Sequence, residues 1–304
     1  MRSPARSPAR RALRWLGALL LVGAAVVGIL AWRQLRTETV RLDDRAFVVL
    51  GGGGNTLVLA ADDGALVVDT KFSYPASQLK TQVDKLVGKP AKLVINTHYH
   101  FDHSHGNPLY AGARFMAQTR TREHLLALDP GLFGPNAPGA AMLPTELVDD
   151  VRKLRFGDEE IEVRYLGRGH TDGDIVVFLR KRSLLHMGDL FTNGLYPIAD
   201  VKGGGSMRDW VATIDRAIEL QPKTIIPGHG PIATLDDLKA FRAYLGAVWQ
   251  HALDGATAGK SCDDIAGSFD GTPWKMAPIP GFSSQSKNLE TACEEAKAEV
   301  AKTK

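Results

Sequence analysis

The residues best suited to chemistry lie in the stretch Thr97–Asn107, which reads THYHFDHSHGN. Within six residues it offers three imidazoles and one carboxylate, those of His98, His100, Asp102 and His103. Imidazole and carboxylate together suit divalent metals of intermediate softness, with zinc first among them. Because His98 and His100 are two residues apart, they do not share one face of a helix, and we expect them in a loop. The stretch therefore predicts a metal site.

Three further residues of the same chemical types lie elsewhere in the chain, each just past a different apolar run. His170 occurs in GRGHTDGD, Asp189 in LLHMGDLF and His229 in PGHG. Open α/β sheets place their sites at the carboxyl ends of strands, so we expect these side chains to join those of residues 97–107. The remaining histidines are interpreted as ordinary surface or core residues: His105, His124, His186 and His251.

Short apolar runs alternate with amphipathic segments of helical length, which is the pattern of an α/β domain. The predicted strands are rich in Val, Ile and Leu and cover residues 47–50, 56–60, 65–68, 93–95, 161–165, 175–179, 183–187 and 224–226. Helices are predicted at 75–87, 121–128, from the cap at Ser206 to Pro222, and at 235–253. The run Gly51–Gly54 leads into another strand and lacks a following Lys-Ser/Thr, so it predicts a hairpin turn and not a phosphate loop.

The charges of the chain are unevenly distributed. The net charge is +3, but residues 1–36 hold seven arginines and no acidic residue, which leaves 30 basic against 34 acidic residues elsewhere. Between Trp15 and Trp32 no residue is charged, and this run is long enough to cross a membrane as one helix. Since most of the arginines precede the run, the positive-inside rule predicts an inner-membrane anchor with a periplasmic body. A cleaved export signal is the alternative, and the acidic body argues against nucleic acid as a partner.

These features divide the chain into an N-terminal anchor at 1–36, a folded body at 37–253 and a C-terminal appendage at 254–304. The appendage is weakly apolar and is expected to end in a short exposed helix. It contains both cysteines, Cys262 and Cys293. In an exported protein a disulfide between them would contribute roughly 3 kcal/mol to stability, and two free thiols are the alternative.

The order H-x-H-x-D-H followed by His, Asp and His resembles the metallo-β-lactamase superfamily, over about residues 40–245. The resemblance implies an α/β fold, an αβ/βα four-layer sandwich, here preceded by one transmembrane helix. It also implies two Zn²⁺ ions between the sheets, with iron and manganese left open. The implied ligands are His98, His100 and His170 for the first ion, Asp102, His103 and His229 for the second, and Asp189 as the bridge. Asp69 in ALVVDT would support a ligating histidine, and a simple strand-ending residue is the alternative.

Two zinc ions held in this way would lower the pKa of a shared water, so that a bridging hydroxide could attack a small ester, thioester, lactone or lactam. Asp102 and Asp189 are the expected catalytic residues, and Asp102 could orient the hydroxide or pass a proton to the leaving group. His100 argues against a di-iron flavoprotein reductase, which carries glutamate there. Asp189 matches the glyoxalase II ligand set and departs from class B β-lactamases, which carry Cys or Ser. A β-lactamase and a non-catalytic metal-binding protein are the alternatives.

The expected partner is a small-molecule substrate, and the sequence leaves the oligomeric state open. The loop Phe191–Ser206 resembles that of lactamases, and we expect substrate contacts from Asn193, Tyr196 and Lys202. A solvated Lys202 is the alternative. Further walls are expected from the loop Lys71–Ser77 and from a lid at Leu132–Leu143, which is rich in glycine and proline.

Overall fold

The computed structural model describes residues 35–137, 139–279 and 281–302. The chain divides into two compact units, residues 1–36 and 37–304, and nearly all of the described residues belong to the second unit. The transmembrane helix expected between Trp15 and Trp32 lies outside the described residues. Within the ranges that are described, no helix is both long and apolar enough to cross a membrane.

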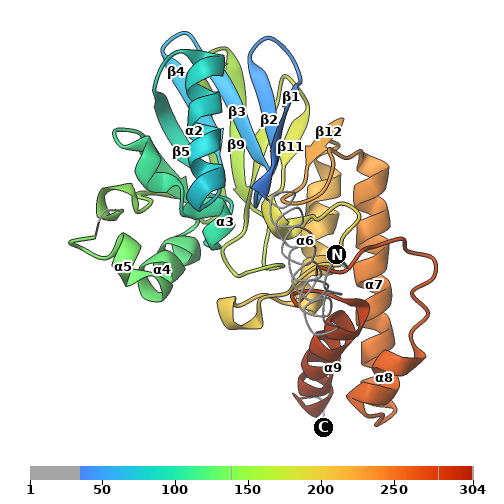
Figure 1. Ribbon diagram of the computed structural model, residues 1–304. Coiled ribbons are helices and arrows are strands. Elements are labelled where there is room, and N and C mark those ends of the chain that lie inside the picture. The colour runs from blue at the N-terminus through green and yellow to red at the C-terminus, as the bar shows by residue number, and fades with distance from the viewer. Residues whose placement is uncertain (1–34, 138, 280, 303–304) are drawn as a thin grey trace, which may run out of the picture. The chain divides into compact units, whose positions relative to one another are not determined.

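The first sheet has seven strands in the described part of the chain, and they follow one another in sequence order (Figure 1). They are β1 (Thr37–Arg41), β2 (Ala46–Gly51), β3 (Thr56–Ala61), β4 (Gly64–Val68), β5 (Ala91–Ile95), β6 (Arg114–Ala117) and β7 (Glu146–Leu147). Strands β1 to β4 pair antiparallel, whereas β4 to β7 run parallel. Parallel pairing needs a crossover, which helix α2 (Ser73–Val87) provides between β4 and β5. The carboxyl ends of β4 and β5 therefore lie at the same edge.

The second sheet has the strand order β12-β11-β10-β9-β8 among the described residues. Its strands are β8 (Val151–Phe156), β9 (Glu159–Tyr165), β10 (Ile175–Leu179), β11 (Leu184–His186) and β12 (Thr224–Ile226). Strands β8 to β11 form an antiparallel meander, and β12 joins β11 in parallel after helix α6 (Met207–Glu219).

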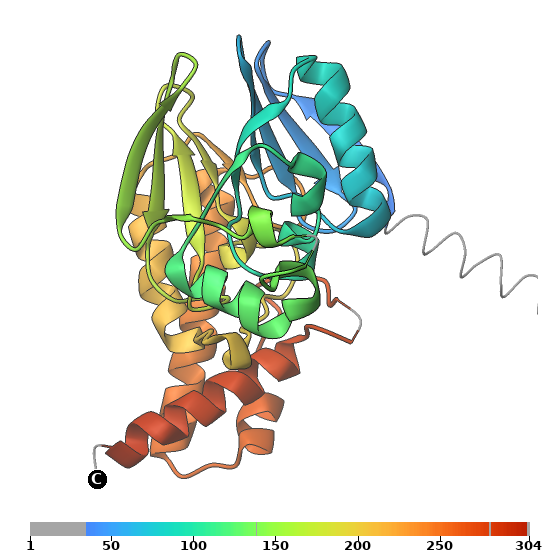
Figure 2. The same cartoon turned by 90° about the vertical axis from the view of Figure 1, so that its left-hand side faces the viewer.

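The two sheets pack face to face, and neighbouring residues of one strand enter different layers because side chains alternate across a sheet. Val48 and Val177 belong to the core between the sheets. Val49 packs outward with residues of α2, whereas Val176 packs outward with α6 and with α7 (Leu235–Thr257). Helix, sheet, sheet and helix thus form four layers, and Figures 1 and 2 show α2 covering the outer face of the first sheet.

Most of the predicted elements are present within a few residues of their expected bounds, including the hairpin turn, where Gly51, Gly52 and Gly53 have φ of 75°, 62° and 93°. Four strands of the structure were not predicted, namely β1, β6, β7 and β8. Strand β8 reads VRKLRF and lies at the edge of its sheet with most of its side chains exposed. Because an edge strand of this kind buries little, its sequence contains no apolar run.

The end of the chain differs from the expected short exposed helix. Helices α8 (Cys262–Ser268) and α9 (Gln285–Lys302) belong to the same compact unit as the sheets, and α9 packs along α7. The buried face of α9 consists largely of small residues, among them Ala292 and Ala296, which give little hydrophobic signal but permit close helix packing. Cys262 and Cys293 are joined by a disulfide, with their Cα atoms 5.7 Å apart.

Candidate metal centre

The structure brings the expected ligands together at one end of the two sheets. His98 and His100 follow β5 in a loop, as predicted, but Asp102 and His103 lie on a single helical turn, α3 (Phe101–Ser104). The other three come from the second sheet: His170 follows β9, Asp189 lies on a 3₁₀ turn after β11, and His229 follows β12. Because all of these strands end at the same edge, residues that are 131 positions apart meet there.

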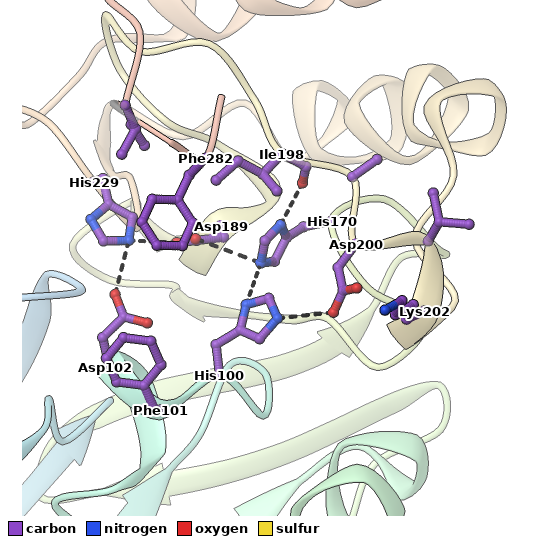
Figure 3. A pocket seen from close by; sticks show the side chains of 13 residues that line it. His100, Phe101, Asp102, His170, Asp189, Ile198, Asp200, Lys202, His229 and Phe282 are labelled. Atoms are coloured by element: carbon purple, nitrogen blue, oxygen red, sulfur yellow. Dashed lines mark hydrogen bonds and ion pairs between the residues drawn. The ribbon is translucent and has the colours of Figure 1, made fainter. Parts of the chain in front are cut away.

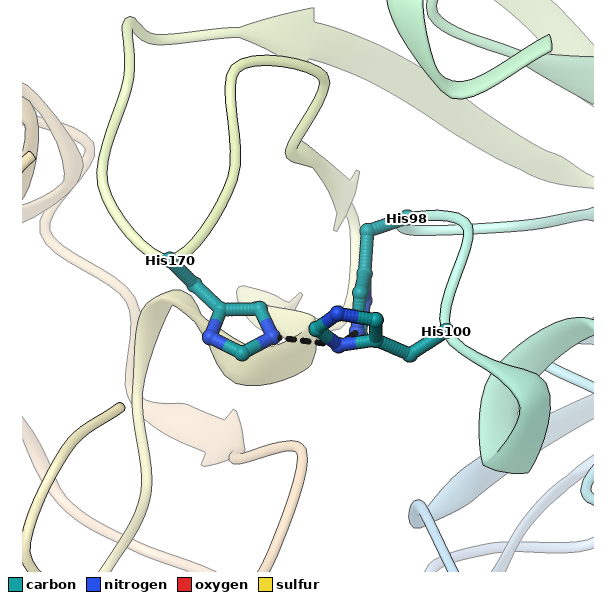
Figure 4. Close-up of side chains that lie close together, drawn as sticks. All are labelled: His98, His100 and His170. Carbon is teal, nitrogen blue, oxygen red and sulfur yellow. Dashed lines mark hydrogen bonds between the residues drawn. The ribbon is translucent and has the colours of Figure 1, made fainter. Parts of the chain in front are cut away.

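Three imidazoles form the first group of potential ligands (Figure 4). His100 Nδ1 lies 3.1 Å from His98 Nε2 and 2.8 Å from His170 Nε2. Burial lowers the pKa of His98 well below its usual value, and it lowers the pKa of His170 to about 4, with a further contribution from His100. Both rings are therefore neutral near pH 7. Neutral imidazoles that point their nitrogens at one another provide the lone pairs that a divalent metal needs.

Asp102, His103 and His229 form the second group. His229 Nε2 lies 3.3 Å from Asp102 Oδ2. Burial alone would lower the pKa of both histidines, but carboxylates outweigh it. Asp189, Asp102 and Asp69 hold the pKa of His103 well above its usual value, and Asp189 and Asp102 raise that of His229 to about 9. The carboxylates thus attract positive charge to this group, and a divalent cation would replace the protons.

Asp189 lies between the two groups. Its Oδ1 is 3.2 Å from His103 Nε2 and 3.4 Å from His229 Nε2, while its Oδ2 is 3.6 Å from His170 Nε2. Burial would raise its pKa, but His229 and His103 lower it well below the usual value. Asp189 Oδ1 and His103 Nε2 are buried, and neither makes a hydrogen bond. A cation between these two facing buried polar atoms would satisfy both, so the residues fit a metal.

Asp69 has the supporting position that the resemblance implied. It is fully buried, and its Oδ2 lies 2.7 Å from His103 Nδ1. The same carboxylate accepts hydrogen bonds from the backbone N–H and the hydroxyl of Thr97, both at 2.8 Å. With Nδ1 of His103 engaged by Asp69, the Nε2 atom is the one left to face Asp102 and Asp189.

One supporting carboxylate, that of Asp200, was not predicted. Its Oδ2 lies 3.0 Å from His100 Nε2 and also accepts a hydrogen bond from the hydroxyl of Tyr99. Burial would raise the pKa of Asp200, but the bonds with His100 and Tyr99 outweigh it and lower the pKa. The same loop orients His170, whose Nδ1 lies 2.6 Å from the carbonyl oxygen of Ile198. No sequence signal marks Asp200, because its role depends on where the loop Phe191–Ser206 folds.

Two glycines let the backbone approach the centre closely. A Cβ atom on Gly54 would lie 2.2 Å from Cε1 of His103, and one on Gly228 would lie 1.9 Å from Oδ1 of Asp189. The glycine turn is held in place by Lys71, which is fully buried and donates hydrogen bonds to the carbonyl oxygens of Gly51 and Gly54, both at 2.6 Å. Burial lowers the pKa of Lys71 to about 7.

A cavity of about 610 Å³ opens onto the centre (Figure 3). Of the three residues expected to contact substrate, Lys202 lines this cavity. Asn193 and Tyr196 do not: Asn193 donates a hydrogen bond to the carbonyl oxygen of Pro231, and Tyr196 packs against Tyr244 at a ring distance of 5.8 Å. The described residues of the expected walls at 71–77 and 132–143 do not line the cavity either. The lining residues are His100, Phe101, Asp102, His170, Asp189, Ile198, Ala199, Asp200, Val201, Lys202, His229, Ile279 and Phe282.

The family model of the metallo-beta-lactamase superfamily matches residues 49–229, which include all seven of the expected ligands. The chain therefore belongs to the metallo-β-lactamase superfamily, whose members are metal-dependent hydrolases. It is 27% identical over 195 residues to a metallo-beta-lactamase type 2 of Bacillus cereus, covering 61% of this chain and 73% of that protein. It is 25% identical over 213 residues to the acyl-coenzyme A thioesterase MBLAC2 of Bos taurus, covering 60% and 75%.

Solved structures show the same fold. A metallo-beta-lactamase from Pontibacter korlensis superposes with a TM-score of 0.58 at 20% identity and covers 69% of this chain and 99% of that one. The stereoselective inverting sec-alkylsulfatase Pisa1 from Pseudomonas sp. superposes with a TM-score of 0.71 at 15% identity. The match covers 88% of this chain and 52% of the sulfatase chain. At such identities the likeness concerns the fold alone.

Proposed function

We propose that the protein is a dinuclear zinc hydrolase that cleaves a small ester, thioester, lactone or lactam. The observation that carries this proposal is the position of Asp189, whose two carboxylate oxygens face ligands of the two separate groups. In this proposal His98, His100 and His170 hold one ion, and Asp102, His103 and His229 hold the other. A purely structural zinc site is closed and needs no second ion or open cavity.

Bound divalent cations lower the pKa of water and polarise a carbonyl oxygen, which is the chemistry that hydrolysis of an acyl bond requires. The protein contributes the geometry. The side chain of Asp102 is 17% exposed and lines the cavity, so its carboxylate is placed to accept a proton from the attacking water and return it to the leaving group. Asp69 and Asp200 fix the rings of His103 and His100, so that the ligand nitrogens keep their direction during the reaction.

The test measures two properties of the purified full-length chain: its metal content, by mass spectrometry, and its hydrolytic activity. We expect about two zinc ions per chain, and Asp189→Ala should lose at least one of them together with turnover. Asp44→Ala is the matched control, because Asp44 is 96% exposed and its surface ion pair contributes little. Retention of both ions and of full activity by Asp189→Ala would refute the proposal.

A comparison of substrates tests which class of acyl bond the protein cleaves. Relatives of the chain carry the names of a β-lactamase and of an acyl-coenzyme A thioesterase. Nitrocefin, a thioester and a homoserine lactone should be assayed with the same zinc-loaded preparation. We expect the thioester or lactone to be cleaved at least tenfold faster than nitrocefin. The reverse order would favour a β-lactamase.

We further propose that the protein is anchored in the inner membrane with its catalytic body in the periplasm. The proposal rests on the arginines that precede the apolar run Trp15–Trp32, and the disulfide between Cys262 and Cys293 suits an oxidising compartment. Alkaline phosphatase fused after Arg36 should be active, whereas an inactive fusion would place the body in the cytoplasm.

A further inference from the structure

The walls of the cavity above the metal centre are apolar. Beyond the expected ligands, the described residues of the lining include only two charged side chains, Asp200 and Lys202, and Asp200 is already engaged by His100 and Tyr99. The other lining residues that the structure describes carry aliphatic or aromatic side chains: Phe101, Ile198, Ala199, Val201, Ile279 and Phe282. Such a lining removes apolar surface from water when a ligand enters, which favours an apolar ligand.

Some of the exposed apolar residues of the described chain are grouped at this cavity. Among its nine exposed large hydrophobic side chains, three line the cavity: Phe282 is 67% exposed, Val201 55% and Phe101 49%. Exposed apolar side chains that are grouped in this way mark a binding surface, whereas single ones are ordinary. Figure 3 shows that Phe101 and Phe282 enter the site from different segments of the chain.

Phe101 is supported from behind. Its ring meets that of Phe72 edge to face, with the ring centres 5.0 Å apart. Phe72 in turn lies against the glycine turn, where a Cβ atom on Gly53 would be 3.1 Å from its ring. The side chain is therefore exposed on one side and fixed on the other, as a preformed binding wall requires.

The opposite wall comes from the C-terminal segment, by which we mean residues 269–279 and 281–284. Ala277 anchors this segment to the loop that carries Asp200: its N–H donates to the carbonyl oxygen of Gly194 at 2.8 Å, and its own carbonyl oxygen accepts from the N–H of Tyr196 at 3.1 Å. Closer to the cavity, Ser283 donates its N–H to the carbonyl oxygen of Ile279 at 3.0 Å. The segment is thus hydrogen-bonded to the loop that carries Asp200.

Both ends of the C-terminal segment are fixed as well. It connects α8 to α9, and the disulfide between Cys262 and Cys293 joins these two helices. On α9, Asn288 donates to the carbonyl oxygen of Pro197 at 2.7 Å and accepts a hydrogen bond from the hydroxyl of Tyr244 at 2.9 Å. The helix is therefore tied to the loop Phe191–Ser206, which forms another part of the cavity wall.

We propose that the substrate carries an apolar acyl group of medium length, and that Phe282 and Ile279 of the C-terminal segment bind this group opposite Phe101. The proposal rests on the hydrolase function proposed above and specifies its substrate class. It makes Phe282 a specificity residue, although it lies 53 positions beyond His229, the last expected metal ligand.

The test is the rate of hydrolysis of N-acetylcysteamine thioesters by the zinc-loaded full-length protein. Each fully buried methylene is worth about a threefold to fourfold gain, and the wall is partly open. We therefore expect kcat/KM to rise at least tenfold from the acetyl to the octanoyl thioester. The glutaryl thioester, which matches the hexanoyl in size but ends in a carboxylate, should be at least tenfold poorer than the hexanoyl. A flat series, or a better glutaryl substrate bound through Lys202, would overturn the proposal.

Phe282→Ala should reduce the acetyl-to-octanoyl rise at least threefold, mainly through KM. Leu147→Ala is the matched control, because Leu147 is 43% exposed on β7 and does not line the cavity; it should leave the series unchanged. An equal loss on every thioester in Phe282→Ala would show a structural role only and would contradict the proposal.

Calorimetric binding of octanoate to the zinc-loaded protein separates this proposal from the hydrolase function. We expect Phe282→Ala to weaken octanoate binding at least threefold, with no change in Leu147→Ala. If the zinc-loaded protein hydrolyses no ester, thioester, lactone or lactam, the hydrolase proposal fails, and the octanoate result still decides the role of Phe282. Octanoate binding that does not depend on Phe282 would overturn the present proposal alone.

Discussion

Gly54→Ala is expected to damage the metal centre with a single methyl group. The added Cβ atom would lie 2.2, 2.5 and 2.6 Å from three atoms of the His103 ring. The ring has little freedom to retreat, because it is fully buried and Asp69 holds its Nδ1 at 2.7 Å. Either the hairpin turn or the ring must therefore move.

The cost can be estimated for both cases. Forcing an extra methyl group into a packed site typically costs about 1 to 3 kcal/mol of stability if the turn moves. If the ring moves instead, His103 loses part of the support that orients it as a ligand. Loss of such support weakens metal affinity about 10-fold to 100-fold, which corresponds to about 1.4 to 2.8 kcal/mol. The ion that depends on His103 should be the one affected. The other ion, which we propose is bound by His98, His100 and His170, should be retained.

Equilibrium dialysis with zinc and urea unfolding of the metal-free protein measure the two effects. We expect Gly54→Ala to bind one zinc ion as tightly as the native protein and the second at least tenfold more weakly, or to unfold at a lower urea concentration. Gly267→Ala is the control, because a Cβ atom there has no neighbour within 4 Å. Two zinc ions bound with native affinity, together with a native urea midpoint, would show that the contact with His103 does not matter.

Two further predictions concern the stability of the compact unit 37–304. Replacing Cys262 and Cys293 by alanine removes a crosslink between residues 31 positions apart. The free energy of unfolding should fall by roughly 3 to 4 kcal/mol, measured by urea unfolding of the native and variant proteins. A difference below about 1 kcal/mol would contradict this. Lys71 has a pKa of about 7 when folded, against about 10.4 when unfolded. The unfolded chain therefore binds more protons than the folded chain between these two pH values. The free energy of unfolding should accordingly rise with pH from about 7 to about 10. The destabilisation caused by burying the charged lysine is fully present below about pH 7. Lys71→Met should lack this rise in stability with pH. Curves of unfolding free energy against pH that run parallel for the native protein and the variant would contradict this prediction.

The sequence was sufficient to locate the expected ligands because each combines a metal-binding residue type with a place just after an apolar run. His170, Asp189 and His229 are far apart in the chain, yet the rule that strand ends share one edge brings them to the same place. The hairpin turn followed from an equally local pattern, whereas the supporting role of Asp69 was implied by the family resemblance. A local pattern is sufficient to predict the position of a residue when that position depends on the strand that the residue follows.

The walls of the cavity could not be predicted in this way. Asn193 and Tyr196 lie in the expected loop, but pairing of that loop with Ala277 directs them away from the cavity. The same pairing brings Phe282 to the site, and no local pattern marks a contact between segments some 80 residues apart. Asp200 was missed for the same reason. The walls of the cavity are set by tertiary contacts, whereas the positions of the expected ligands are set by secondary structure.

Each of the two ligand groups draws side chains from both sheets. His98 and His100 follow a strand of the first sheet and His170 follows a strand of the second, and the same division separates Asp102 and His103 from His229. A cation in either group would therefore act as a crosslink between the two halves of the body. Release of the ion and separation of the sheets become linked equilibria, and each tenfold rise in free zinc above its dissociation constant would add about 1.4 kcal/mol of stability per ion. The zinc supply of the compartment would then set how firmly the two halves of this protein hold together.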